Sequence, residues 1–240
     1  MSDKQFVLEI WGDLACFSRP ELKVERFSYP VITPSAARGI LDAIYCKPTE
    51  FQWRIHRVEI LKPIRYIALR RNEVKEVISV SAVQKYMSGA REIEPIYADD
   101  TPELAGTDKK GRTQRQTMAL RDVRYRIFAS IRPKTGQEQC RKAIVEQAER
   151  RISRGKCFQQ PYLGCREFAA YFEQYDPAVH RDEPAVVDLD LGYMLYDVFD
   201  LSMPGGPQAG KPAVSLFHAF IKQGVMEVPD YESDQVLKPA

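Results

Sequence analysis

Residues 120–131 read LRDVRYRIFASI, and this stretch decides the fold. Apolar and polar side chains alternate along it with a period of two, which is typical of a strand with one buried face. The apolar face holds Val123, Tyr125, Ile127 and Ala129. Arg124 and Arg126 fall on the opposite face. The pattern predicts a long strand, and the other elements are placed around it.

Upstream of this strand, residues 5–11 alternate well enough for a first strand, and a turn-rich stretch follows from residue 12 to 30. Thr33 and Pro34 then form a helix start, with an N-cap threonine and a proline at the first helical position. The helix places its apolar side chains near one face: Ala37, Ile40, Leu41, Ile44 and Tyr45. Gly39 inside this helix costs stability, so we expect close packing there more than close approach of a ligand.

Residues 51–61 and 64–69 predict two further strands, and residues 75–115 predict a hairpin or a partly mobile insertion because no core pattern persists there. Residues 137–153 predict a second helix, closed by Gly155 at its C′ position. Its expected stripe holds Ala143, Ile144, Gln147, Ala148 and Arg151. The resulting order is β-α-β-β-α-β, which predicts an α+β fold of the ferredoxin-like (RRM-like) kind over residues 1–172. Residues 173–240 predict a small C-terminal antiparallel β domain, with strands near 186–199 and 213–228.

The balance of charge also changes along the chain, between residues 166 and 167. Residues 1–166 hold 31 Lys and Arg against 20 Asp and Glu, whereas residues 167–240 hold 4 against 13. A basic body favours a polyanionic partner, and an acidic region favours a different neighbour. The alternative is an uneven scatter of charge over a solvated surface.

Several functional classes find little support. No apolar run approaches the roughly 20 residues of a membrane span, and the start of the chain lacks a signal-peptide pattern, so we expect a cytoplasmic protein without a membrane partner. The five cysteines form no CxxC pair and the three histidines lie far apart, which disfavours a zinc site. There is no Walker motif and no GxGxxG. We therefore expect no metal and no small-molecule cofactor.

The segment most suggestive of chemistry is RRISRGKCFQQPYLGCREF, residues 150–168. Basic groups at a helix end, beside glycines that allow close backbone approach, can hold phosphates. Phe158 and Tyr162 can stack on bases. In the alternative reading, the cations complement the helix dipole and the aromatic rings belong to the core. The full set of RNA-binding candidates is Arg19, Lys23, Arg26, Arg38, Arg70, Arg71, Arg115, Arg121, Arg150, Arg154, Lys156 and Arg166.

Four separated stretches carry a family resemblance: residues 11–48 (WGDLACFSRPELKVERFSYPVITPSAARGILDAIYCKP), 70–74 (RRNEV), 157–168 (CFQQPYLGCREF) and 190–195 (DLGYML). They resemble the CRISPR-associated RAMP-superfamily subunit at the crRNA 5′ end of type I-C (Dvulg) Cascade. The resemblance implies a ferredoxin-like domain with a smaller β domain. It also implies binding of the crRNA repeat and its 5′ handle, metal-independent endoribonuclease processing of precursor crRNA, and assembly with other Cascade subunits in antiviral defence.

The resemblance also implies catalytic residues, namely a tyrosine at the end of the first helix and a Lys-His pair at the start of the second. Tyr45 matches the tyrosine. The pair falls on residues 143–144, with Lys142 one residue away, and no histidine occurs between His56 and His180. Tyr45 and Lys142 are therefore the catalytic candidates. Since tyrosine is a poor base unless nearby cations lower its pKa, a non-catalytic scaffold that binds the handle remains the alternative.

Overall fold

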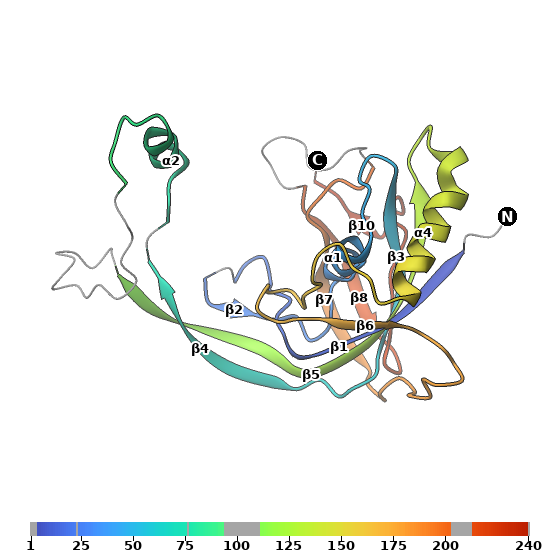
Figure 1. Cartoon of the computed structure of the whole chain (residues 1–240). Coiled ribbons are helices and arrows are strands. Elements are labelled where there is room, and N and C mark those ends of the chain that lie inside the picture. Colours follow the sequence, from blue (N-terminus) through green and yellow to red (C-terminus); the bar gives the residue numbers. More distant parts are fainter. Residues whose placement is uncertain (1–3, 23, 76, 94–110, 203–212, 240) are drawn as a thin grey trace. The chain divides into compact units, whose positions relative to one another are not determined.

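The computed structural model describes residues 4–22, 24–75, 77–93, 111–202 and 213–239 (Figure 1). The chain forms two compact units, one of residues 1–67 with 118–240 and the other of residues 68–117. The first unit is a mixed α/β structure with a large antiparallel sheet and a second, smaller sheet. The division expected at residue 172 lies within the first unit and stays a prediction.

The large sheet has β5 (Arg112–Pro133) near its centre, longer at both ends than the strand predicted over 120–131. The strand order is β6-β1-β5-β3-β9, and two further strands, β2 and β4, also pair with β5. The other members are β1 (Gln5–Ala15), β2 (Arg26–Phe27), β3 (Phe51–Ile60), β4 (Tyr66–Val74), β6 (Tyr171–Gln174) and β9 (Val225–Glu227). β1 pairs antiparallel with both β5 and β6, and β3 pairs antiparallel with β5 and β9.

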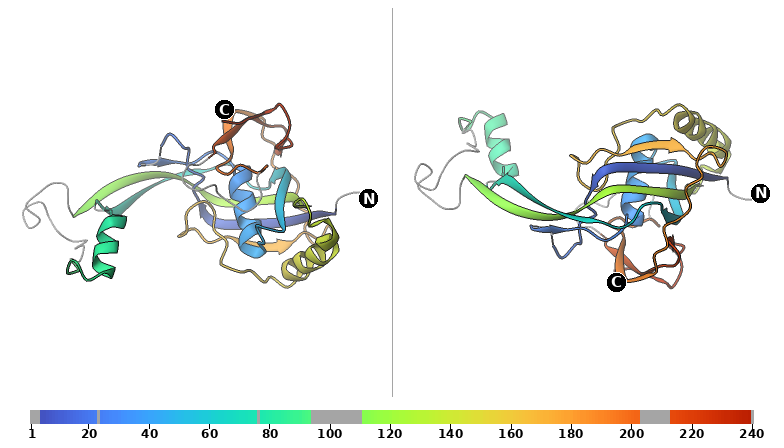
Figure 2. Two further views of the ribbon diagram at one scale, coloured as in Figure 1. Left: turned by 90° about the horizontal axis from the view of Figure 1, so that it is seen from above. Right: turned by 90° about the horizontal axis from the view of Figure 1, so that it is seen from below.

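Two helices cover one face of this sheet. The first, α1 (Pro34–Ile44), begins at Thr33 as predicted, and the threonine hydroxyl accepts a hydrogen bond from the Ala36 N–H at 3.2 Å. It lies across the strands (Figure 2) and packs against β3. The second, α4 (Arg141–Ser153), follows the short 3₁₀ turn η1 (Glu138–Cys140) and packs against β6 and α1.

The core lies between these helices and the sheet. Every residue of the predicted α1 stripe is buried, and so is the predicted apolar face of residues 120–131. The stripe predicted for α4 is partly wrong, because Ala143 is exposed and Ile152 is buried with Ile144 and Ala148. On β3, a bulge between Ile55 and Arg57 explains why the buried side chains change phase between Ile55 and Val58.

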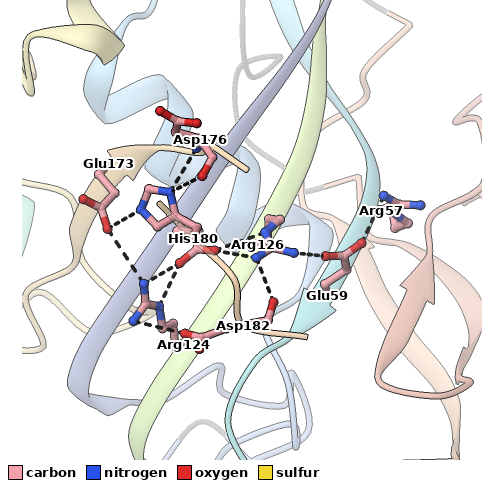
Figure 3. A network of polar contacts seen from close by, with 9 residues as sticks. Arg57, Glu59, Arg124, Arg126, Glu173, Asp176, His180 and Asp182 are labelled. Atoms are coloured by element: carbon pink, nitrogen blue, oxygen red, sulfur yellow. Dashed lines mark hydrogen bonds and ion pairs between the residues drawn. The ribbon is translucent and has the colours of Figure 1, made fainter. Parts of the chain in front are cut away.

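The other face of the sheet is polar. Glu9 accepts hydrogen bonds from Arg124 (2.8 Å) and Arg126 (2.7 Å), and Arg126 also donates to Glu59 at 2.8 Å (Figure 3). Glu9, Arg126 and Glu59 are all buried. The two arginines therefore lie on the predicted face, but their charges are compensated inside the protein.

The segment after β6 covers part of this polar face. The guanidinium of Arg126 lies 4.0 Å from the centre of the Tyr175 ring and donates to the Asp182 carbonyl at 3.0 Å. His180, which is buried, contacts Glu173 at 2.9 Å. Because both the ring and the backbone of this segment contact the buried arginine, it is tied to the network of Figure 3.

The smaller sheet is antiparallel, with the order β10-β8-β7. Its strands are β7 (Leu189–Asp197), β8 (Ser215–Ile221) and β10 (Val236–Leu237). β9, which was expected in the same small domain, pairs instead with β3 of the large sheet. This pairing joins the C-terminal region to the large sheet.

The second unit contains α2 (Val80–Met87), which begins at Ser79. The Lys75 N–H donates to the Gly111 carbonyl at 2.9 Å, so the ends of β4 and β5 close a hairpin within the predicted insertion. Residues 94–110 of that insertion lie outside the described part of the chain. Throughout the described ranges, no helix has the length and apolar character needed to cross a bilayer.

Candidate nucleic-acid interface

The segment from residue 155 to 168 runs from one end of α1 to the other. Gly155, with φ of +59°, closes α4 as predicted, and its N–H donates to the Ile152 carbonyl at 3.0 Å. The N–H groups of Phe158 and Gln159 both donate to the Ala43 carbonyl in the last turn of α1, at 2.8 and 3.1 Å. Further along, Leu163 accepts from the Cys16 N–H at 3.0 Å. The segment is thus fixed by backbone hydrogen bonds at both ends.

Gly164 is required by close backbone packing. Its φ is +85°, and a Cβ built there would lie 2.0 Å from the Cys16 carbonyl oxygen. The sequence suggested that glycines in this segment bring N–H groups to a phosphate, but Gly164 instead packs against Cys16. Its role is therefore to fix the segment.

We expect Gly164→Ala to destabilise the protein by several kcal/mol, since the strain of a left-handed alanine, about 1–2 kcal/mol, is added to a clash with backbone. The matched control is Gly155→Ala, because Gly155 has a similar positive φ but nothing within 4 Å of a Cβ. Urea denaturation of both variants measures the difference. Equal losses would show that the contact with Cys16 is not limiting.

An open cavity of about 530 Å³ lies beside α1, and its lining extends from Thr33 at the N-terminal end of the helix to Asp42 near its last turn. Three of the four stretches quoted for the resemblance supply its walls, among them Ser18, Ser35, Gly39, Tyr162 and Leu195. Nothing lies within 4 Å of a Cβ built on Gly39, which is exposed. The expectation that Gly39 serves packing is therefore wrong, and the helix surface at Gly39 is open to a ligand.

Several arginines lie close in sequence to the segments that line this cavity. Arg19 lies over the Tyr29 ring at 4.7 Å, with Glu21 at 3.8 Å. Arg26 contacts the Cys165 sulfur at 3.5 Å and Glu167 at 3.8 Å. Arg166 is exposed and has no ion-pair partner among the described residues. Lys23 lies outside the described residues.

Arg38 lines the same cavity, but its guanidinium is engaged within the protein. It binds both carboxylate oxygens of Asp197, at 2.7 and 3.0 Å, and it also contacts Asp42 at 2.5 Å. Asp197 is buried at the end of β7. These contacts hold α1 to the smaller sheet, while contact between Arg38 and RNA stays a prediction.

Tyr45 lies at the C-terminal end of α1. It is 6% exposed, and its ring lies 5.1 Å from that of Phe51. Its carbonyl accepts a hydrogen bond from the Trp53 indole at 2.8 Å. The guanidinium of Arg151 lies 5.6 Å from the Tyr45 ring centre and donates to the Ile44 carbonyl at 3.3 Å.

Burial raises the pKa of Tyr45 above its usual value, even though Lys47 and Arg151 act in the opposite direction. Neighbouring cations therefore act in the suggested direction, but burial outweighs them and the net shift of the pKa is upward. At neutral pH the phenol keeps its proton, which suits a hydrogen-bond donor or general acid better than a base.

Within the described residues, no contact brings Lys142 beside Tyr45. Its side chain is 89% exposed, and its nearest carboxylate is that of Glu146, at 4.0 Å. Lys142 precedes Arg151 by nine residues, which is about 13 Å along a helix axis. Arg151 is thus the cation of α4 that reaches Tyr45. Sequence reasoning put Arg151 on the inward stripe of α4 but did not name it as a site residue.

The remaining candidates form a basic helix end and a separate group. At the end of α4, Arg150 donates to Gln147, while Arg154 and Lys156 are exposed and lack ion-pair partners in the described ranges. The other candidates lie on strands. Arg121 is exposed on β5 opposite Leu14, and Arg70 is exposed on β4. Arg71 and Arg115 both form ion pairs with Glu73, at 3.4 and 3.1 Å. Arg70, Arg71 and Arg115 belong to the second compact unit.

One group of potential metal ligands occurs among the described residues. Glu9, Glu173 and His180 offer ligand atoms within 4.8 Å of one another. Both oxygens of Glu9 already accept hydrogen bonds from Arg124 or Arg126. The arginines supply the positive charge that a cation would bring, so this group is best described as an ion-pair network.

Comparisons with known proteins agree over nearly the whole chain. A family model described as "CRISPR-associated protein (Cas_Cas5)", of the Cas5d type, matches residues 6–229. A protein of Mannheimia succiniciproducens named "CRISPR pre-crRNA endoribonuclease Cas5d" is 40% identical over 237 residues, covering 95% of this chain and 96% of its own. A protein of the same name from Thermus thermophilus is 38% identical over 233 residues, covering 92% and 90%.

Solved structures share the fold at lower identity. A crystal structure of a CRISPR-associated protein superimposes with a TM-score of 0.61 at 20% identity, covering 98% of this chain and 97% of that chain. A functionally uncharacterized protein from Streptococcus mutans gives 0.60 at 20% identity, with the same coverage. These two structures support the arrangement of the elements only.

Proposed function

The chain belongs to the Cas5d family of CRISPR-associated proteins, and on that premise we propose that it binds the crRNA 5′ handle and cuts precursor crRNA within the repeat. The observation that carries the proposal is the segment 155–168. It lines an open cavity beside α1 and leads to the C-terminal end of that helix, where a tyrosine is flanked by basic groups. A strand of RNA laid along this segment meets cations at both ends.

We infer that the sheet has the ferredoxin-like arrangement. The order β6-β1-β5-β3, with α1 between β1 and β3 and α4 between β5 and β6, supports this inference. RRM domains bind RNA on their open sheet face. Here that face holds the buried network of Glu9, Arg126 and Glu59, so the RNA surface we propose lies on the helical side.

For catalysis we propose that the 2′ oxygen attacks the adjacent phosphorus, loses its proton to solvent and forms a 2′,3′-cyclic phosphate. Cations stabilise the phosphorane, and Tyr45 donates a proton to the leaving 5′ oxygen as the P–O5′ bond breaks. The phenol is protonated at neutral pH because burial raises its pKa. Arg151 supplies the nearest positive charge, and Lys142 remains a candidate that would need RNA to approach it. The names of both relatives favour this processing role over a non-catalytic scaffold.

Incubating the protein with its cognate repeat RNA in EDTA tests the proposal. We expect one discrete cut at the handle boundary and tight retention of the 5′ handle. Tight binding of an uncut repeat would support the scaffold alternative. Absence of both binding and cleavage would refute the function altogether.

We also propose that the acidic residues 173–240 form a β domain that contacts other subunits of a type I-C Cascade. The excess of acidic residues after position 166 makes this region unsuited to RNA phosphates. Its smaller sheet and the strand β9 would then hold a protein neighbour beside the RNA-bound body. Co-purification with the other Cascade subunits, before and after removal of RNA, measures this contact.

Removing the basic end of α4 should weaken RNA binding without unfolding the protein. We expect Arg150→Ala with Arg154→Ala to lower affinity for the repeat and to reduce the salt dependence of binding, because fewer counterions are released. Fluorescence anisotropy at several salt concentrations measures both effects.

The control for this variant is Arg181→Ala with Lys222→Ala, which removes the same charge from exposed positions in the acidic region. It should leave affinity almost unchanged. If the two double variants bind RNA equally well, the end of α4 is not part of the interface.

A further inference from the structure

Phe158 is unusually exposed to solvent for an aromatic residue. The residue is 78% exposed, the largest exposed fraction of any aromatic residue in the described ranges. The alternative that this ring belongs to the core is therefore wrong. Isolated apolar side chains are common on protein surfaces, so exposure alone assigns no role, and the assignment depends on how the ring is held and what surrounds it.

The backbone that carries the ring is fixed. The N–H groups of Phe158 and Gln159 both donate to the Ala43 carbonyl, which belongs to the last turn of α1 and has no partner within the helix. Ala43 precedes Tyr45 by two residues, so the hydrogen bonds tie the ring to the same end of α1 as the tyrosine. Because the backbone is already fixed, only the side-chain torsions of Phe158 have to be ordered when a planar group stacks on the ring.

The surroundings of the ring are basic. Arg154 and Lys156 lie four and two residues before Phe158, are exposed, and have no ion-pair partner in the part of the chain that the structure describes. The acidic side chains nearest in sequence are already paired, Glu149 with Lys4 at 2.6 Å and Glu167 with Arg26 at 3.8 Å. An exposed ring next to unpaired cations matches the chemistry of single-stranded nucleic acid, with its planar bases and anionic backbone.

We propose that Phe158 stacks on an unpaired base of the repeat RNA and so positions the neighbouring phosphate beside Tyr45. This inference rests on the proposed function and assigns a subsite within it. Stacking on an aromatic ring recognises any base face, so Phe158 supplies affinity and strand position more than sequence preference.

The test compares Phe158→Ala with Phe158→Trp in the full-length protein, using the cognate repeat RNA. A stacked base contributes about 1–3 kcal/mol, so alanine should weaken binding by about 5- to 150-fold, while tryptophan should retain the wild-type affinity. Phe220→Ala is the matched control, because Phe220 is 53% exposed on β8 in the acidic region. It should leave binding unchanged.

A second readout separates stacking from a general loss of affinity. 2-Aminopurine placed at successive unpaired positions of the RNA should be quenched at one position by the wild-type protein, and that quenching should disappear with Phe158→Ala. The slope of affinity against salt should not change, because no charge is removed, whereas Arg150→Ala with Arg154→Ala should reduce it.

The results distinguish this inference from the function on which it rests. If the wild-type protein binds and cuts the repeat but Phe158→Ala does so equally well, with no change in quenching, the stacking role is overturned and the proposed function stands. If the wild-type protein neither binds nor cuts, both fail.

Discussion

Replacing Arg126 with alanine should destabilise the protein by about 3–5 kcal/mol, the usual cost of breaking a buried ion pair by removing one partner. Arg126 donates to Glu9 and to Glu59, and both carboxylates are buried. Without the guanidinium, Glu59 keeps only its ion pair with the half-exposed Arg57, at 3.0 Å, and Glu9 keeps only Arg124 among the arginines in the described ranges. The free energy of unfolding from urea titration measures the loss.

Two further variants show whether the effect comes from uncompensated charge. Glu59→Gln combined with Arg126→Ala should be more stable than Arg126→Ala alone, because it removes a buried carboxylate that has lost its buried arginine partner. Arg154→Ala, at an exposed position without an ion-pair partner in the described ranges, should change stability by less than about 0.5 kcal/mol. A loss of that small size for Arg126→Ala itself would mean that the network contributes little to folding.

Hydrophobic periodicity predicted the elements whose residues pack on one face. The strand at residues 120–131 and the α1 helix were predicted on their correct faces because alternation and 3.6-residue spacing are local signals. The partners of Arg126 were not predictable, since Glu9 is 117 positions away in sequence and meets it only through strand pairing. For the same reason β9 was expected in the small domain but pairs with β3.

Prediction of the candidate site from the sequence is limited in the same way. Segment 150–168 was identified from its composition, and the structure ties it by backbone hydrogen bonds to Ala43 in the last turn of α1 and to Cys16 after β1. Composition could not reveal that Arg38 is engaged by Asp197, or that Arg151 instead of Lys142 reaches Tyr45. Each of these facts depends on which residue of a distant element lies opposite, and a pattern of residue types does not specify that.

Tyr45→Phe should reduce cleavage of the cognate repeat about 10²- to 10⁴-fold, the usual contribution of a positioned proton donor, while RNA affinity and folding stay nearly unchanged. Phenylalanine preserves the packing against Phe51 and leaves the hydrogen bond from the Trp53 indole to the backbone carbonyl of residue 45 intact.

Because burial raises the pKa of Tyr45, its phenol stays protonated between pH 6 and 9. The ratio of wild-type to variant rates should therefore be constant over this range. A ratio that rises tenfold per pH unit would indicate a phenolate base instead. Tyr193→Phe, at an exposed position on β7 in the acidic region, is the control and should cleave normally. An equal loss in both variants, or none in Tyr45→Phe, would remove Tyr45 from the reaction.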